Sequence, residues 1–286
     1  MTTGDHFDHK NAPLRIGRVR LKVRDLEKVA GFYEAVLGLT RLEEGAGSVT
    51  LGSATAPLLE LAGDPALTPR DRRDAGLFHT AFLLPSRADL GRWLRFAADR
   101  RIPLQGASDH IVSEALYLAD PEGNGIEIYA DRAPSHWRDA RGGIHMTTES
   151  MDVDGVLGAA EGSEWAGFPE DGFIGHVHLQ VGDTGAAEQF YNGVLGFDIA
   201  SCYHGASFFG SGGYHHHLAG NIWNSRGAGA RPQGSAGLDR VEVIVRDAAT
   251  RDAILARAHD AGLTIEPDGQ SATLTDPWGT DIALVA

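Results

Sequence analysis

A histidine, a tyrosine and a glutamate surround a tight turn in the stretch HIVSEALYLADPEGNGIE, residues 110–127. His110 and Tyr117 precede an Asp-Pro-Glu-Gly sequence, and Glu127 follows it between two isoleucines. An Asp-Pro-x-Gly sequence between two apolar, alternating segments predicts a β-hairpin. A carboxylate flanked by isoleucines is costly to bury without a partner, so Glu127 either faces solvent on an edge strand or belongs to a site.

Two further histidines lie on predicted strands that open similar segments. His79 lies in FHTAFLL on an apolar face, and His176 lies in HVHLQV on a polar face that it shares with His178. A lone histidine on an apolar face is more often a hydrogen-bonded core residue than a ligand. Two histidines and one carboxylate, however, suit Fe(II) or Mn(II) and leave three coordination positions open. A closed structural zinc site would need several cysteines, and Cys202 is the only cysteine.

Three consecutive histidines, His215–His217, occur in the segment GGYHHHLAGNIW. The run is too short and too far from either end to be a purification tag. On a predicted strand, His215 and His217 share one face and His216 takes the other. The run is therefore either a solvated or hydrogen-bonded strand or part of a site.

The chain repeats itself, which predicts how these residues are positioned. The segment IGRVRLKVRDLEKVAGFYEAVLGLT recurs without a gap as IGHVHLQVGDTGAAEQFYNGVLGFD, and AGLFHTAFLLP more weakly as AGLDRVEVIVR. Each copy begins with a strand and a helical stretch, and the second pair ends in an Asp-Pro-x-Gly hairpin. The sequence therefore predicts an α+β chain of four strand–helix–strands modules. They span about 14–64, 75–131, 172–224 and 236–286.

The four modules predict two domains, each with its own core. The first domain covers residues 14–131 and the second covers 172–286. The segment 132–171 between them is rich in Gly, Asp and Ser and is predicted to be a linker, with one short helix at DVDGVLGAA.

Composition excludes several classes of function. The net charge of −14 argues against a nucleic acid or an anionic membrane as partner. No apolar run approaches the roughly 18 residues that a membrane helix needs, and the first 15 residues lack the apolar core of a signal peptide. A single cysteine fits a reducing compartment, so we expect a cytoplasmic protein, as a monomer or a homo-oligomer.

On these residues and modules, the chain resembles the vicinal oxygen chelate superfamily, which is built from paired βαβββ modules. It is most similar there to two-domain bacterial catechol 2,3-dioxygenases, over residues 16–286. In the extradiol dioxygenase signature, a His is followed after about six residues by a hydrophobic residue and Tyr. Two residues later comes Asp-Pro-x-Gly, and then Glu. Residues 110–127 fit that spacing. Ser108 departs from the residue types usual before the His. The resemblance implies curved mixed sheets around a central cleft, the glyoxalase/bleomycin-resistance/extradiol dioxygenase fold.

The resemblance also implies roles for the site residues. The metal ligands would be His79, Glu127 and His176, holding Fe(II), a small aromatic diol and O₂. His216 would take or give a proton beside the substrate, and His110 and Tyr117 would hydrogen-bond substrate oxygens. This ring-cleaving enzyme is the first hypothesis.

Modules one and four depart from the ligand pattern. Arg18 replaces the first-strand histidine of module one, and Arg240 and Ala283 stand at the ligand positions of module four. The metal is therefore expected between modules two and three, and Arg18 and Glu60 are expected to form an ion pair instead.

Two other functions remain open. An alignment of ELAG with HLAG puts His217 at the position of a fourth ligand, as in glyoxalases. Four protein ligands around Ni(II), Zn(II) or Mn(II) would predict a lyase or an isomerase. The third hypothesis is a non-catalytic protein that binds a small aromatic molecule. The sequence does not decide which histidine of the run faces the metal.

Overall fold

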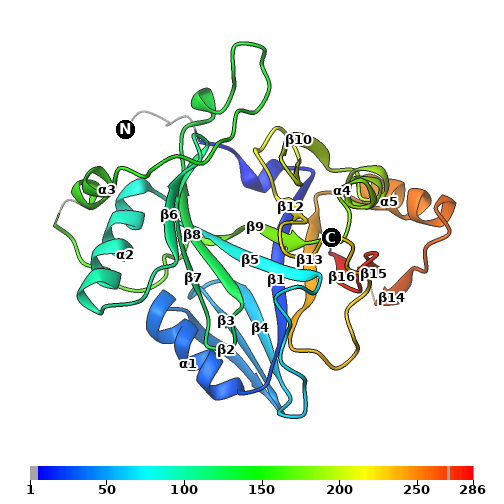
Figure 1. Ribbon diagram of the computed structural model, residues 1–286, viewed down its shortest axis with the longest axis horizontal. Helices are drawn as coiled ribbons and strands as arrows, with labels where there is room; N and C mark the ends of the chain where they lie inside the picture. The colour runs from blue at the N-terminus through cyan, green and yellow to red at the C-terminus, as the bar shows by residue number, and fades with distance from the viewer. Residues whose placement is uncertain (1–5, 161, 269–270, 286) are drawn as a thin grey trace.

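The computed structural model describes residues 6–160, 162–268 and 271–285, which form two mixed sheets of eight strands each (Figure 1). The first sheet has the order β14 (Glu266–Asp268), β15 (Ser271–Thr275), β16 (Asp281–Val285), β13 (Gly237–Val245), β1 (Leu14–Val23), β4 (Pro57–Gly63), β3 (Ser48–Gly52) and β2 (Thr40–Gly45). The second has the order β10 (Asp198–Tyr203), β11 (Ala206–Gly210), β12 (Leu218–Asn221), β9 (Phe173–Gln180), β5 (Gly76–Leu83), β8 (Gly125–Asp131), β7 (Ser113–Ala119) and β6 (Gly106–Asp109).

The helices lie on two opposite sides of the molecule, with α1 and α2 on one side and α4 and α5 on the other (Figure 1). The α-helices are α1 (Leu26–Leu37), α2 (Arg87–Asp99), α3 (Val153–Ala159), α4 (Thr184–Ala187) and α5 (Ala248–Asp260). A π-helix, η3 (Glu188–Val194), continues α4, and the two 3₁₀ helices are η1 (His9–Asn11) and η2 (Pro134–His136). The predicted order of one strand, one helix and three strands is therefore present four times.

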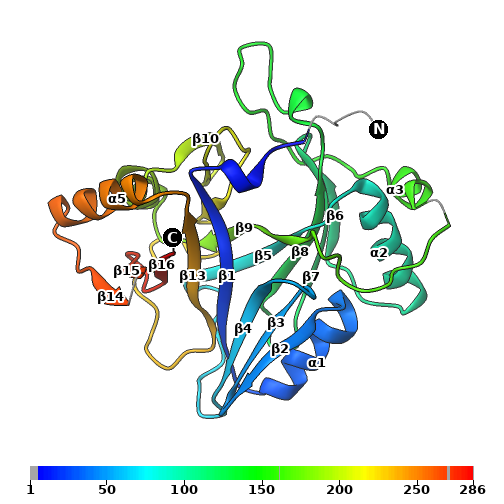
Figure 2. The same ribbon diagram turned by 180° about the vertical axis from the view of Figure 1, so that it is seen from behind.

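The two sheets do not follow the order of the modules along the chain. β1 pairs with β13, so the first sheet joins modules one and four, and β5 pairs with β9, so the second joins modules two and three. Figure 2 shows β1 and β13 side by side from behind. The division into domains at residues 14–131 and 172–286 stays a prediction, because each sheet takes one module from either half.

The tyrosine of the repeated Phe-Tyr pair joins each helix to the hairpin of the next module. Asp25 caps α1, whose last turn ends at Gly38 with a φ of 74°, a conformation that favours glycine. The buried Tyr33 hydrogen-bonds Asp120 in the hairpin of module two, and Tyr191 donates to Asp276 in the hairpin of module four over 2.7 Å. These contacts tie together modules that are neighbours along the chain.

Residues 132–160 of the predicted linker, 132–171, are folded onto module two. The short helix expected there is α3, which Asp152 caps at its first turn. Gly91 of α2 lies so close to α3 that a Cβ atom would be 2.1 Å from the carbonyl oxygen of Val156. Within the described residues, no helix is long and apolar enough to span a membrane.

Candidate metal centre

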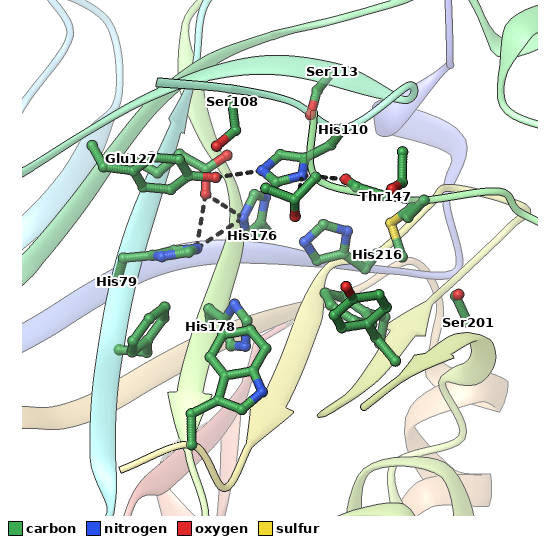
Figure 3. A pocket seen from close by; sticks show the side chains of 17 residues that line it. His79, Ser108, His110, Ser113, Glu127, Thr147, His176, His178, Ser201 and His216 are labelled. Carbon is green, nitrogen blue, oxygen red and sulfur yellow. Dashed lines mark hydrogen bonds and ion pairs between the residues drawn. The ribbon is translucent and has the colours of Figure 1, made fainter. Parts of the chain in front are cut away.

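His79, Glu127 and His176 converge on one face of the second sheet (Figure 3). They come from three adjacent strands, β5, β8 and β9, with β5 in the centre. Ala81 of β5 faces Glu127 on one side and His176 on the other, and His79 lies two residues earlier on the same face. The small side chain of Ala81 leaves room above the central strand, so the three longer side chains meet there.

The distances between the three side chains fit a shared metal ion. Nε2 of His79 lies 2.8 Å from Oε2 of Glu127, and Nε2 of His176 lies 3.3 Å from the same oxygen. The two Nε2 atoms are 3.3 Å apart. Donors at right angles around an ion, each about 2.1 Å from it, lie about 3.0 Å from one another. Among the described residues, these three form the group of metal-binding side chains whose ligand atoms lie close enough together to share one ion.

The protonation states of these groups also suit a metal. Burial lowers the pKa of His176 to about 4 although Glu127 opposes the shift, so the ring is neutral at neutral pH. Burial raises the pKa of Glu127, but the two imidazoles outweigh it and hold that pKa well below its usual value. An ionised carboxylate and a neutral imidazole are the forms that bind divalent metals.

His110 and Tyr117 form a rigid pair above this group. Nδ1 of His110 lies 2.6 Å from the carbonyl oxygen of Thr147 and therefore carries the proton, because a carbonyl only accepts. Nε2 of His110, 2.6 Å from the Tyr117 hydroxyl, then accepts. Tyr117 lies opposite Glu127 on the neighbouring strand, and burial and that carboxylate raise its pKa well above 10. The phenol therefore stays protonated.

The three consecutive histidines point in different directions. His216 lines the same pocket, and its ring centroid lies 4.1 Å from that of His176. His215 turns away from the pocket and contacts Asp131. His217 does not line the pocket, and its ring packs against Tyr214 instead. The run precedes β12, so strand alternation does not fix these directions.

The pocket around these residues encloses about 280 Å³ and has mainly aromatic and hydroxyl-bearing walls. Its other lining residues are Phe78, Ser108, Ser113, Met146, Thr147, Thr148, His178, Ser201, Tyr203, Phe208 and Trp223. Met146, Thr147 and Thr148 belong to the predicted linker, and their place in the pocket wall was not predicted from the sequence. Glycine and polar residues dominate that segment, so its sequence carries no signal that it folds over the pocket.

The first sheet has ion pairs where the second has its ligand group. The predicted pair forms, with Nη1 of Arg18 at 3.8 Å from Oε2 of Glu60. A closer partner is Glu242, whose Oε1 lies 2.7 Å from Nη2 of Arg18. Glu60 also lies 3.3 Å from Nε of Arg20. Fixed positive charges thus occupy this sheet where the second sheet has imidazoles.

Comparisons with known proteins agree with this architecture. A family model described as the Glyoxalase/Bleomycin resistance protein/Dioxygenase superfamily matches residues 15–128 and 173–284. A catechol-2,3-dioxygenase from Bacillus subtilis is 41% identical over 268 residues, 92% of this chain and 93% of the relative. Biphenyl-2,3-diol 1,2-dioxygenase 3 from Rhodococcus globerulus is 30% identical over 166 residues, 54% of this chain and 85% of the relative.

Solved structures share the fold at low sequence identity. A glyoxalase I mutant from Zea mays superposes with a TM-score of 0.60 at 15% identity, over 97% of this chain and 95% of that chain. A putative dioxygenase from Bacillus subtilis gives a TM-score of 0.61 at 11% identity, over 94% of this chain and 84% of that chain. These likenesses concern the arrangement of the modules alone.

Proposed function

The chain belongs to the Glyoxalase/Bleomycin resistance protein/Dioxygenase superfamily, and we propose that within it the protein is an extradiol ring-cleaving dioxygenase. The substrates are an aromatic diol and O₂. The observation that carries this proposal is the convergence of two imidazoles and one carboxylate at 2.8–3.3 Å in a pocket with aromatic walls. Its relatives, named as dioxygenases of catechol and of biphenyl-2,3-diol, support the same reaction.

The metal is a divalent transition metal, and we propose Fe(II), with His79, Glu127 and His176 as ligands. A set of two His and one carboxylate leaves three positions open, which two diol oxygens and O₂ would fill. Bound Fe(II) supplies a Lewis acid for the diol oxygens and a path for electrons from the ring to O₂. Mn(II), Ni(II) and Zn(II) are the alternatives, and of these only Mn(II) shares the redox chemistry of Fe(II).

The protein side chains orient the diol and move its protons. His216 takes a proton from a diol hydroxyl at the ring nitrogen that faces the pocket, because its imidazole lies beside His176. Tyr117 donates its hydroxyl hydrogen to Nε2 of His110, so its oxygen is left to accept a hydrogen bond from a hydroxyl of the substrate. Phe78, Phe208 and Trp223 pack against the aromatic ring and exclude water from it.

A lyase or isomerase with four protein ligands is supported less well. That function needs a fourth donor beside the three, and His217 packs against Tyr214 outside the pocket. A protein that only binds aromatics has no use for a buried carboxylate between two imidazoles.

Oxygen uptake by the reconstituted protein tests this function. The chain is loaded with Fe(II) under argon, and catechol and air-saturated buffer are then added. We expect one O₂ consumed per catechol and a yellow ring-fission product. His79→Ala and Glu127→Ala should abolish both, whereas His259→Ala, at an exposed histidine of α5, should change neither. Iron bound in full without oxygen uptake would instead support a binding protein.

A further inference from the structure

A chain of hydrogen bonds leads from the pocket through the run of histidines to a carboxylate outside it. Nδ1 of His216 lies 2.9 Å from Nδ1 of His215, and Nε2 of His215 lies 2.9 Å from Oδ1 of Asp131. Asp131 is the last residue of β8, the strand that carries Glu127. Neither His215 nor Asp131 lines the pocket.

The surroundings hold this chain in one geometry. His215 is fully buried, and the ring of Trp137 packs edge-on against it with centroids 4.9 Å apart. The hydroxyl of Tyr214 donates to Asp131 over 3.3 Å, and Nε2 of His9 lies 3.7 Å from the other carboxylate oxygen. The carboxylate of Asp131 therefore has several fixed neighbours and little freedom to turn.

The chemistry of the groups decides where the hydrogens lie. An ionised carboxylate only accepts, so Nε2 of His215 must carry a hydrogen. An imidazole with its single hydrogen on Nε2 has a lone pair on Nδ1, so Nδ1 of His216 is the donor between the two rings. The remaining ring nitrogen of His216, Nε2, is left with a lone pair.

The ionisation of Asp131 supports this assignment. Burial raises the pKa of its carboxyl group, but the contacts with His215 and then His9 outweigh burial and lower the pKa to about 2. The carboxylate is therefore charged at neutral pH and acts as an acceptor throughout.

We propose that Asp131 and His215 are positioning residues that fix His216 in the tautomer with hydrogen on Nδ1, so that its Nε2 can accept a proton from the substrate. This inference rests on the proposed function, because a proton acceptor beside the metal is needed for an aromatic diol. In this step the O–H bond of the diol breaks, and the electron pair of that bond stays on the diol oxygen. The proton forms a new N–H bond with the lone pair of Nε2 of His216. The negative charge of Asp131, reached through His215, stabilises the resulting imidazolium.

The first test is ¹⁵N NMR of the imidazoles in the zinc-loaded protein, because Zn(II) is diamagnetic. We expect Nδ1 of His216 to be protonated and Nε2 to be bare. In Asp131→Asn the amide can donate to Nε2 of His215. The hydrogen of His215 should then move to Nδ1, and that of His216 should move to Nε2. A wild-type spectrum with the hydrogen on Nε2 of His216 would overturn the inference, whether or not any variant folds.

The second test is steady-state kinetics of the Fe(II)-loaded enzyme. Asp131→Asn should lower kcat about a hundredfold with KM changed less than about threefold, because a misplaced hydrogen removes proton transfer and not binding. The matched control is Asp239→Asn in the first sheet, whose carboxylate is 15% exposed against 16% for Asp131 and is likewise ion-paired. That control should keep the wild-type kcat. Unchanged kcat in Asp131→Asn would refute the positioning role and leave the proposed dioxygenase function standing. A wild-type protein without oxygen uptake would refute that function, and the NMR result would still decide the tautomer of His216.

Discussion

Nε2 of His79 and Nε2 of His176 lie 3.3 Å apart, and both face the same carboxylate oxygen of Glu127. All three side chains are almost completely buried. Two imidazole nitrogens this close cannot both carry a hydrogen without repulsion, so at least one of them turns a lone pair toward a carboxylate oxygen that itself only accepts. A cation between them would bond all three donor atoms at once, so this arrangement is better suited to a metal than to a hydrogen-bonded core.

Metal binding should therefore stabilise the folded chain through these three residues. Zn(II) or Mn(II) at a hundred times its Kd is expected to add about 2.7 kcal/mol to the free energy of unfolding, because the ion binds the folded state alone. Differential scanning fluorimetry should show a higher Tm for the wild type and no shift for Glu127→Gln or His79→Ala.

The control is His110→Ala, because His110 bonds Tyr117 and the Thr147 carbonyl and not the ligand group. This variant should keep the metal-dependent rise in Tm. A rise of the same size in His79→Ala would argue against the shared site.

The internal repeat made much of the fold predictable from sequence. Because one pair of copies aligns without a gap and the other aligns more weakly, the four modules and the positions equivalent to His176 and His79 could be read from the sequence. Arg18 and Arg240 excluded modules one and four, and this left modules two and three for the metal. The pairing of β1 with β13, more than 200 residues apart, has no signal in local patterns, because it depends on which sheet edges meet.

Other features depend on tertiary packing and could not be predicted. The three histidines precede β12 in irregular backbone, so strand alternation could not tell His216 from His217. The second copy of the repeated helix continues as a π-helix, although it keeps the Phe-Tyr and Val-Leu-Gly residues of α1. The contact of His215 with Asp131 joins residues 84 positions apart, which no motif in either segment indicates.

The metal-free protein should lose stability as the pH falls from about 6.5 to 4. The pKa of His176 is about 4 in the folded state against 6.5 for the free side chain, so the unfolded chain binds more protons in this range. The free energy of unfolding therefore rises with pH. The titration of His176 alone should lower it by about 3 kcal/mol as the pH falls from about 6.5 to 4. Urea denaturation at pH 7, 6, 5 and 4 measures this loss.

The variant His176→Gln should show a smaller loss over the same range, because it removes one titrating group. The remaining loss would come from His178, His216 and His217, whose pKa values burial also lowers. Stability that is flat between pH 7 and 4 would contradict the prediction.

His217 should be dispensable for metal binding and unfavourable for stability. Within the described part of the chain, neither of its ring nitrogens has a hydrogen-bond partner, although the side chain is buried. Leaving a buried polar group unsatisfied costs about 1–3 kcal/mol, so His217→Leu should raise the free energy of unfolding by about 1 kcal/mol.

Chemical denaturation, metal analysis and kcat of His217→Leu together check this expectation. The iron content and kcat should stay at the wild-type level, whereas His216→Leu should keep the iron and lose most of kcat. Loss of iron in His217→Leu would revive the hypothesis of a fourth ligand and of glyoxalase-like chemistry.

The pocket should select uncharged diols over carboxylated ones. None of the described residues that line it is a lysine or an arginine, and the chain carries a net charge of −14. A ring carboxylate would lose its hydration against Phe78 and Trp223, whose ring centroids lie 5.4 Å apart, without gaining a cationic partner. We expect kcat/KM for catechol to exceed that for 3,4-dihydroxybenzoate at least about tenfold, a difference of about 1.4 kcal/mol.

Substitutions at Trp223, which is 47% exposed, test this preference. Trp223→Lys can offer an ammonium group to the carboxylate and should lower the ratio of the two kcat/KM values, whereas Trp223→Phe should preserve that ratio. Equal kcat/KM values for both diols in the wild type would show that the aromatic walls do not set this preference.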